Sequence, residues 1–143
     1  MTCRVEVNID AGAESVWKLL VDADGYPRWN STVTGIDGDI REGARIKIHV
    51  PGTRQTFTPK VSGVVPCQRM LWMNGVGGVF KGVRRFKLQS RPDGSTDFEM
   101  EERFSGLIFA LTRKMLPDFQ PIFEAYASDL KREAQRLERE KVT

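Results

Sequence analysis

The most constraining feature of the sequence is a long stretch of helical periodicity at residues 117–140. Its apolar residues recur three or four positions apart, which places them on one face of a helix: Phe119, Ile122, Phe123, Tyr126, Leu130, Ala134 and Leu137. The opposite face is densely charged. Pro117 suits the first turn, where a backbone N–H needs no helical partner. Such a helix is about as long as a small domain is wide, so it must pack across most of what precedes it.

The whole chain is typical of one soluble globular domain, spanning residues 1–143. Hydrophobic residues make up 40% of the chain and charged residues 29%, an ordinary balance for such a domain. The net charge is only +3, and the basic residues are interleaved with acidic ones. A nucleic-acid-binding protein usually concentrates its basic residues on one face. We therefore expect no nucleic-acid partner.

Several site types are disfavoured by what the chain contains. Its longest apolar run, residues 107–111, is too short to span a bilayer, so we expect a cytoplasmic protein without stable membrane insertion. One histidine and two distant cysteines, Cys3 and Cys67, form no metal-ligand pattern, and we expect free thiols, no metal and no cofactor. The glycines near residue 75 precede a predicted strand, which favours a hairpin over a phosphate-binding loop.

The order of predicted elements is strand, short helices, strands and long helix. Residues 3–10 alternate between apolar and polar side chains, as a half-buried strand does. A short amphipathic helix follows to about Val21, with Asp10 as a possible N-cap, and a loop or second short helix covers residues 22–30. Six extended runs separated by turn residues come next: 32–36, 44–50, 55–65, 68–74, 79–90 and 95–104.

These elements predict an α+β domain in which a curved antiparallel sheet of about seven strands wraps around the C-terminal helix, because short connections make neighbouring strands antiparallel. Taking alternate residues gives an inner face that meets the helix: Ile46, Ile48, Val50, Phe57, Val61, Val65, Met70, Trp72, Phe80, Gly82, Arg84, Phe86, Leu88, Phe98, Met100, Glu102 and Phe104. His49, the only histidine, is expected to face outward. A curved sheet closing on one helix tends to leave a cavity between them.

Several segments, taken in this order, resemble the START-like superfamily, also called SRPBCC or Bet v 1-like, and within it the polyketide cyclase/dehydrase and lipid transport group. They span most of the chain, at residues 9–11, 14–22, 26–30, 43, 70–72, 82–88, 102–106 and 130–134. The resemblance implies a helix-grip fold with an internal cavity for an apolar ligand, but no particular reaction. Gly12 stands where members often carry Pro, and Arg84 stands where many carry His. The resemblance therefore does not extend to chemistry that needs an internal imidazole.

Arg84 and Glu102 are the most informative polar residues, because both fall on the predicted inner face of consecutive strands. Charged side chains are seldom buried without a partner, so we expect an ion pair. This pair can anchor the polar end of a ligand, hold Glu102 as a general base, or serve the structure alone. Asn74 and Tyr126 are further candidate anchors, and Glu102 and Tyr126 are the candidate catalytic residues. The apolar candidates, which line a cavity or fill a core, are Trp29, Ile48, Phe57, Trp72, Phe86, Met100, Phe119 and Phe123.

The function that these observations favour is binding or carriage of a hydrophobic small molecule, such as a lipid, an isoprenoid or a polyketide-like compound. One alternative is a cyclase or dehydratase of polyketide type, in which Glu102 or Tyr126 moves protons. Another is an interaction module similar to a co-chaperone. The apolar residues 106–111 either pack against the start of the long helix or form an entrance flap. Whether the protein is a monomer or a homodimer stays open.

Overall fold

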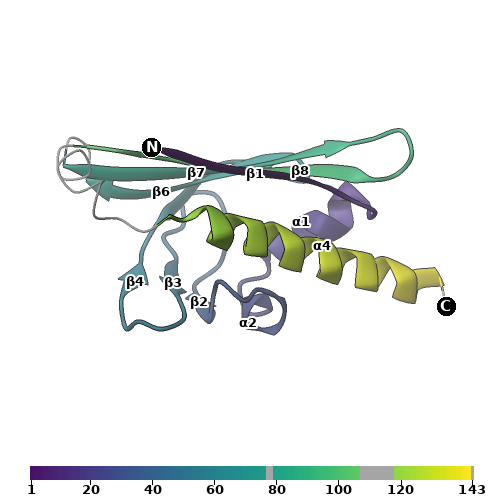
Figure 1. Ribbon diagram of the computed structural model, residues 1–143, viewed down its shortest axis with the longest axis horizontal. Coiled ribbons are helices and arrows are strands. Elements are labelled where there is room, and N and C mark those ends of the chain that lie inside the picture. Colours follow the sequence, from purple (N-terminus) through teal and green to yellow (C-terminus); the bar gives the residue numbers. More distant parts are fainter. Residues whose placement is uncertain (77–78, 107–117, 143) are drawn as a thin grey trace.

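The computed structural model describes residues 1–76, 79–106 and 118–142, and these residues form eight strands and three helices (Figure 1). The elements in chain order are β1 (Thr2–Ile9), α1 (Ala13–Val21), α2 (Tyr26–Trp29), β2 (Gly35–Asp37), β3 (Lys47–His49), β4 (Thr56–Phe57), β5 (Lys60–Val65), β6 (Arg69–Val76), β7 (Phe80–Ser90), β8 (Thr96–Ser105) and α4 (Gln120–Val142). The predicted α+β order, with two short helices after the first strand and a long helix at the end, is confirmed.

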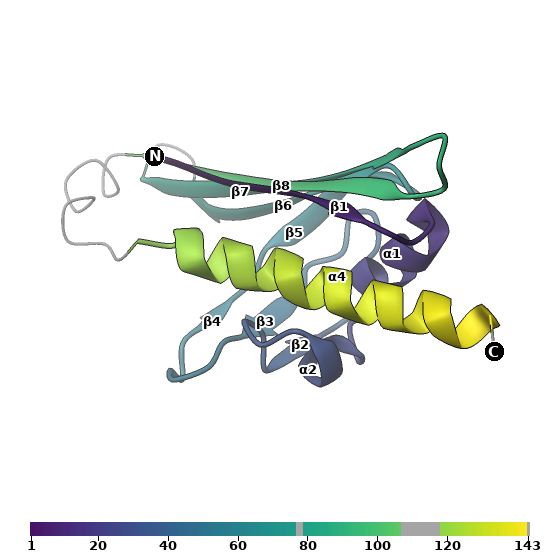
Figure 2. The same ribbon diagram turned by 45° about the vertical axis from the view of Figure 1, so that its right-hand side comes forward.

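The strands form two antiparallel sheets that are joined into one curved surface. The larger sheet has the order β1-β8-β7-β6-β5, and the smaller has the order β2-β3-β4. Backbone hydrogen bonds connect them, from Ile46 N to Pro59 O at 3.0 Å and from Val61 N to Ala44 O at 2.8 Å. In both ribbon views the larger sheet lies above α4, while the smaller sheet and α2 lie below it (Figures 1 and 2). The sheet thus curves around the helix, as expected.

The long helix α4 buries one stripe of side chains and is fixed at both ends. The buried residues follow the predicted spacing: Phe123, Tyr126, Ala127, Leu130 and Ala134. Near its start, Gln120 Nε2 donates to the Arg4 carbonyl of β1 at 2.8 Å. Near its end, Gln135 Oε1 accepts a hydrogen bond from Asp10 N at 3.0 Å, and Glu138 Oε1 accepts one from Ser15 Oγ at 3.0 Å. The helix therefore ties the first strand and the first helix together.

Three local predictions are corrected. The single strand expected at 55–65 is divided into β4 and β5 at Pro59, which has no N–H to donate to a ladder. Asp10 does not cap α1, because Gly12 occupies the N-cap position and no side chain caps the helix. Ile122 is exposed rather than buried. The described part of the chain has eight strands in two sheets, close to the expected number of about seven. The predictions for Pro117 and for residues 107–111 lie outside the described residues.

The described residues also bear on the thiols, on membrane spans and on metal sites. Cys3 is buried, Cys67 is partly buried, and the two thiols are free. Within residues 1–76, 79–106 and 118–142, no helix is both long and apolar enough to cross a membrane. Over the same residues, no group of three or more His, Cys, Asp or Glu side chains is placed to hold a metal ion.

Candidate functional site

A row of side chains crosses the face of the larger sheet that is turned toward α4. Directly opposite residues in an antiparallel pair share a face, and the register places one residue of each strand in this row: Val61, Trp72, Arg84, Glu102 and Cys3. Arg84 Nε donates to Glu102 Oε1 at 2.6 Å. The predicted ion pair is therefore present. Its side chains are 20% and 16% exposed, so the pair is neither sealed in the core nor on the outer surface.

The Arg84 guanidinium is a cation with unused donors. Its central carbon lies 4.9 Å from the centre of the Phe123 ring and 5.7 Å from that of Tyr126, both on α4. Burial works to lower the pKa of Arg84, but Glu102 and the two nearby tyrosines outweigh it, so the pKa is raised and the group stays charged. Among the hydrogen bonds of the described residues, Arg84 uses only Nε. Its two terminal nitrogens thus remain available.

Glu102 is held between a glycine and a thiol. A Cβ added to the buried Gly82 would lie 3.3 Å from Glu102 Oε2 and 3.7 Å from the Phe104 ring, so the glycine leaves room for this carboxylate. On the other side, Cys3 lies directly opposite Glu102 in the ladder. Burial raises the pKa of the Cys3 thiol, and the negative charges of Glu102 and Asp118 raise it further. The thiol is therefore uncharged beside the carboxylate.

Five aromatic side chains fill the centre of the layer between the sheet and α4. They come from α2, β6, β7 and α4, each is at most 3% exposed, and neighbouring ring centres are 4.7 to 6.5 Å apart. We call them the aromatic cluster: Tyr26, Trp29, Trp72, Phe86 and Tyr126. Ring contacts at these distances are favourable, so the cluster is part of the core as well as the inner boundary of the site.

Two hydroxyl groups inside the aromatic cluster bond to each other. Tyr26 Oη lies 2.8 Å from Tyr126 Oη and donates its proton to the Leu20 carbonyl at 2.7 Å. A hydroxyl carries a single proton, so Tyr126 must donate to Tyr26. Burial raises the pKa of Tyr126 to about 12 and that of Tyr26 well above its usual value. Since its proton is already engaged, Tyr126 can accept a hydrogen bond from a ligand but is poorly placed to donate one.

Tyr26 was absent from the residues predicted for the site. Its partner in the site is a hundred positions away in the sequence, so no local pattern connects them. One signal was present: Tyr26 and Trp29 are three positions apart, which puts two aromatic rings on the same side of a helical turn.

The other predicted site residues are distributed along the same face. Ile48 and Met100 are buried, as expected for the inner face. Phe119 is partly buried, and its ring stacks on that of Phe104 with 5.5 Å between centres. Asn74 is partly buried and lies opposite Gly82, next to the row that contains Arg84. These positions bring Asn74 and Phe119 toward the Arg84 end of the layer.

Phe57 was expected to be buried on the inner face, and this is wrong. His49 was expected to face outward, and this is confirmed. Phe57 lies opposite Ile48 but is 44% exposed, because β4 is a two-residue strand at the edge of the smaller sheet. A residue at such an edge has neighbours on one side only. His49 is 41% exposed in its side chain, and its Nε2 lies 2.8 Å from Asp37 Oδ2.

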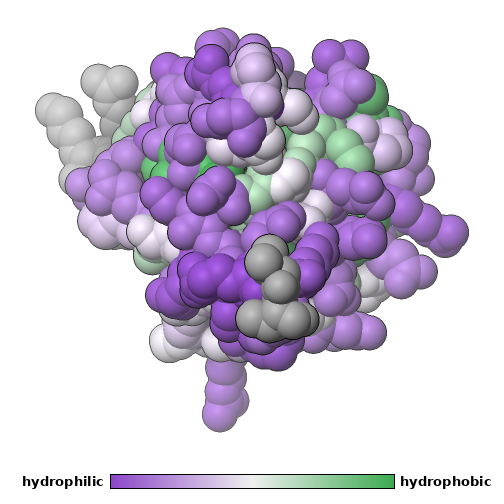
Figure 3. Space-filling view, turned by 90° about the vertical axis from the view of Figure 1, so that its right-hand side faces the viewer, coloured by the Kyte–Doolittle hydropathy of each residue, from purple (hydrophilic) through white to green (hydrophobic). Residues whose placement is uncertain are grey.

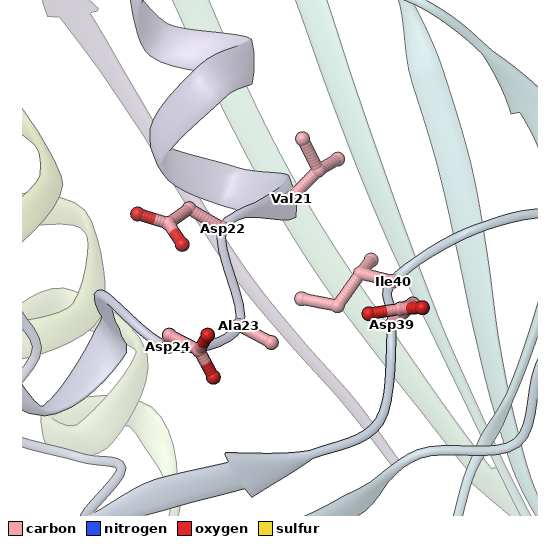
Figure 4. A pocket seen from close by; sticks show the side chains of 6 residues that line it. All are labelled: Val21, Asp22, Ala23, Asp24, Asp39 and Ile40. Atoms are coloured by element: carbon pink, nitrogen blue, oxygen red, sulfur yellow. The ribbon is translucent and has the colours of Figure 1, made fainter.

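Two hollows of the described surface lie away from Arg84. One, of about 180 Å³, is lined by Val21, Asp22, Ala23, Asp24, Asp39 and Ile40 (Figure 4). The other, of about 440 Å³, runs between α1 and the end of α4, where its lining includes Leu19, Leu137 and Lys141. Figure 3 shows that this end of the molecule is covered mainly by hydrophilic side chains, with hydrophobic ones gathered in smaller areas. Neither hollow includes a residue of the Arg84 row.

Comparison with known proteins places the chain in a family. Residues 2–139 match the family model described as polyketide cyclase/dehydrase and lipid transport. No curated protein sequence matches the chain.

Similar solved structures agree with the fold. A protein from Mesorhizobium loti has a TM-score of 0.76 at 18% identity, covering 95% of this chain and 98% of that one. A START superfamily protein from Mycobacterium smegmatis has a TM-score of 0.71 at 18% identity, with the same coverage. A protein of the dynemicin biosynthetic locus has a TM-score of 0.69 at 19% identity and covers 92% of this chain and 46% of its own. Likeness at these identities concerns the fold alone, and the fold is START-like, as the sequence predicts. Because the family model matches residues 2–139, the chain belongs to the polyketide cyclase/dehydrase and lipid transport family.

Proposed function

We propose that this protein binds or carries a hydrophobic small molecule, of lipid, isoprenoid or polyketide-like type, between the sheet and α4. The polar end of the ligand lies at the Arg84–Glu102 pair. The family supports binding of an apolar ligand, and the site supports a defined orientation for it.

The observation that carries this proposal is the state of Arg84. Its side chain is on the inner face of the sheet and is still 20% exposed, with both terminal nitrogens free of hydrogen bonds to the described residues. The rings of Phe123 and Tyr126 cover its guanidinium. A purely structural ion pair gains most when every N–H has an acceptor, because an unused donor in a half-buried place loses part of its solvation. A ligand oxygen supplies the acceptor that this site lacks.

Affinity and orientation then have separate sources. Apolar burial contributes roughly 25 cal/mol per Å² of surface removed from water, so the hydrophobic body of the ligand provides most of the binding free energy. Hydrogen bonds from Arg84 fix which end of the ligand enters first.

The experiment is native mass spectrometry with organic extraction, applied to the protein purified from its own source. The expected result is one apolar compound bound in stoichiometric amount, and loss of most of it in the Arg84→Leu variant. The matched control is Arg85→Leu, because Arg85 is exposed on the opposite face of the same strand. A wild-type protein that is isolated empty and takes up no lipid or polyketide probe contradicts the proposal and favours an interaction module.

A second candidate function is proton transfer in a cyclase or dehydratase. It is favoured by Glu102 Oε2, which accepts no hydrogen bond from the described residues and lies beside the cation of Arg84. A carboxylate placed in this way can act as a general base toward a bound polyketone chain. Loss of turnover with retained binding in Glu102→Gln supports this function, and turnover that is unchanged in this variant excludes it.

A further inference from the structure

Among the described residues, three buried side-chain atoms have no hydrogen-bond partner: Trp29 Nε1, Asn30 Nδ2 and Trp72 Nε1. Their residues are 3%, 3% and 2% exposed. All three atoms are donors, and no buried acceptor of the described side chains is left without a partner. The described buried side chains therefore lack hydrogen-bond acceptors but not donors.

These donors belong to one region of the fold. The Tyr26 ring lies 4.9 Å from that of Trp29 and 6.5 Å from that of Trp72, so both indoles pack against the same phenol. Asn30 follows Trp29 directly, and its backbone N–H closes the α2 turn on Tyr26 O. The Tyr26 hydroxyl donates to the Leu20 carbonyl and accepts from Tyr126. None of the three donors is bonded to this hydroxyl.

The charges nearby decide which kind of acceptor fits. Trp72 is next to Arg84 in the row across the sheet, but the charge of Arg84 is already balanced by Glu102. A carboxylate ligand would add a second negative charge beside Glu102, and an ammonium group would bring further donors. A neutral oxygen does neither.

From these contacts we infer that the α2 end of the interior is a subsite for a neutral carbonyl oxygen of the ligand, which accepts hydrogen bonds from the indole N–H groups of Trp72 and Trp29. This inference rests on the proposed function and adds to it the polar chemistry of the ligand: ketone, ester or quinone oxygens on an apolar body, in preference to acids and amines.

The α2 turn packs over α4 beside the indole of Trp29. It is four residues long and is held to α4 by side chains, with Arg28 Nη1 3.1 Å from Glu133 Oε1, and both Ser31 N and Ser31 Oγ 2.7 Å from Asp129 Oδ2. No strand ladder includes residues 26–29. Because Trp29 and Trp72 are at most 3% exposed, entry of a carbonyl oxygen requires these contacts to open.

The test uses four naphthalene probes with the same number of non-hydrogen atoms: 2-acetylnaphthalene, 2-isopropylnaphthalene, 2-naphthoate and 1-(2-naphthyl)ethylamine. Their affinities for the full chain are measured by fluorescence titration. We expect 2-acetylnaphthalene to bind about tenfold more tightly than the isopropyl compound, since it alone supplies a neutral acceptor on the same body. The preference falls below about threefold in Trp72→Phe and Trp29→Phe and is unchanged in Trp17→Phe, the control for loss of an indole on α1.

A second measurement uses the wild-type protein and therefore does not depend on how well the variants fold. In the nitrogen–proton NMR spectrum of the wild-type protein, the indole N–H signals of Trp72 and Trp29 move downfield with 2-acetylnaphthalene and stay in place with 2-isopropylnaphthalene. Equal affinities without this difference overturn the inference while leaving the proposed function intact. A preference for the acid or the amine overturns it as well. If none of the four probes binds, the inference fails, and the proposed function fails with it only if the protein is also isolated without an apolar compound.

Discussion

The phenolic oxygens of Tyr26 and Tyr126 lie 2.8 Å apart and join α2 to α4 in the interior. Because Tyr26 gives its proton to the Leu20 carbonyl, the two hydroxyls form a chain with one direction, from Tyr126 through Tyr26 to the last turn of α1. The two tyrosines are equally buried and both contact neighbouring rings, but they hold different positions in this series of hydrogen bonds: Tyr126 only donates, whereas Tyr26 accepts and donates.

This direction predicts unequal effects of removing the two hydroxyls. In Tyr126→Phe, the bond from Tyr26 to Leu20 remains, and we expect a loss of about 1 kcal/mol in the free energy of unfolding. In Tyr26→Phe, both the Leu20 carbonyl and the Tyr126 hydroxyl lose their partner, and the expected loss is about 2–3 kcal/mol. Urea unfolding of both variants measures the difference. Equal losses, or the reverse order, contradict the assigned direction.

The same pair predicts an unusual alkaline titration. The chain contains only two tyrosines, and burial raises the pKa of Tyr126 to about 12 and that of Tyr26 well above its usual value. Because the pKa of Tyr126 is raised in the folded state, its protonated hydroxyl stabilises the fold. This stabilisation is complete below the unfolded pKa of 10.0 and is lost as the pH rises toward 12. We expect no tyrosinate absorbance at 295 nm near pH 10 in the native protein.

The control for this titration is the same protein in concentrated urea, in which both tyrosines should ionise near pH 10. In the absence of urea, tyrosinate should appear together with loss of the near-ultraviolet circular dichroism signal. A native protein in which one tyrosine ionises near pH 10 contradicts the buried pair.

A double-mutant cycle on Arg84 and Glu102 tests how much the pair contributes to stability. Leucine at either position leaves one charge without its partner, and we expect each single variant to lose about 2–4 kcal/mol, a little less than for a fully buried pair because both side chains are partly exposed. Replacing both should cost less than the sum of the two, with a coupling of about 1–3 kcal/mol.

The matched cycle uses Arg85 and Glu101, which are opposite each other on the outer face of the same two strands. Arg85 is exposed and Glu101 is paired with Arg103 at 2.8 Å, so a coupling between Arg85 and Glu101 of less than about 0.5 kcal/mol is expected. Thermal or urea unfolding of all variants gives both numbers. A similar coupling in the two cycles would show that the inner pair is no more than a surface ion pair.

The contact between α4 and α2 has a predictable dependence on acid. Burial works to raise the pKa of Glu133, but hydrogen bonds from Arg136 and Arg28 outweigh it, and the pKa is lowered from 4.5. A lowered pKa stabilises the folded state above pH 4.5, and this contribution disappears as the pH falls through the folded value. We expect Glu133→Gln to lose about 1 kcal/mol at pH 7, since its arginine partners are half exposed.

The difference between wild type and Glu133→Gln should therefore be constant at neutral pH and shrink below pH 4.5. Unfolding free energies at a series of pH values measure this, with Glu14→Gln as the control because Glu14 is exposed and lies 3.8 Å from Lys18. A difference that grows in acid contradicts the assigned role of Glu133.

The parts of the fold that depend on local periodicity were predictable from the sequence. Alternation along two neighbouring strands placed Arg84 and Glu102 on the same face, and the structure brings them to 2.6 Å. The stripe of α4 was visible for the same reason, since both patterns repeat along the chain at the period of the backbone. To predict contacts of this kind, it is enough to know these patterns and the order of the helices and strands.

The parts that depend on where an element ends, or on its distant neighbours, were not predictable. Phe57 follows the alternation but lies at the open edge of a short strand, and sequence gives no sign of which strand is at an edge. Tyr26 meets Tyr126 through packing of α2 against α4, and the unpartnered indole of Trp72 is a property of its surroundings rather than of its position in a strand. The aromatic cluster and its donors thus required the three-dimensional structure.

The pairing of β1 with β8 has a consequence for how the chain folds during synthesis. Thr2 is opposite Arg103, Gln120 of α4 bonds to Arg4 of β1, and Gln135 of α4 bonds to Asp10 just after it. A ribosome releases the first strand long before either partner exists, and contacts this distant in sequence form slowly because the intervening chain must first be ordered. Nascent chains that end before Gln120 should therefore remain sensitive to proteases, and the native domain should form only after α4 has left the exit tunnel.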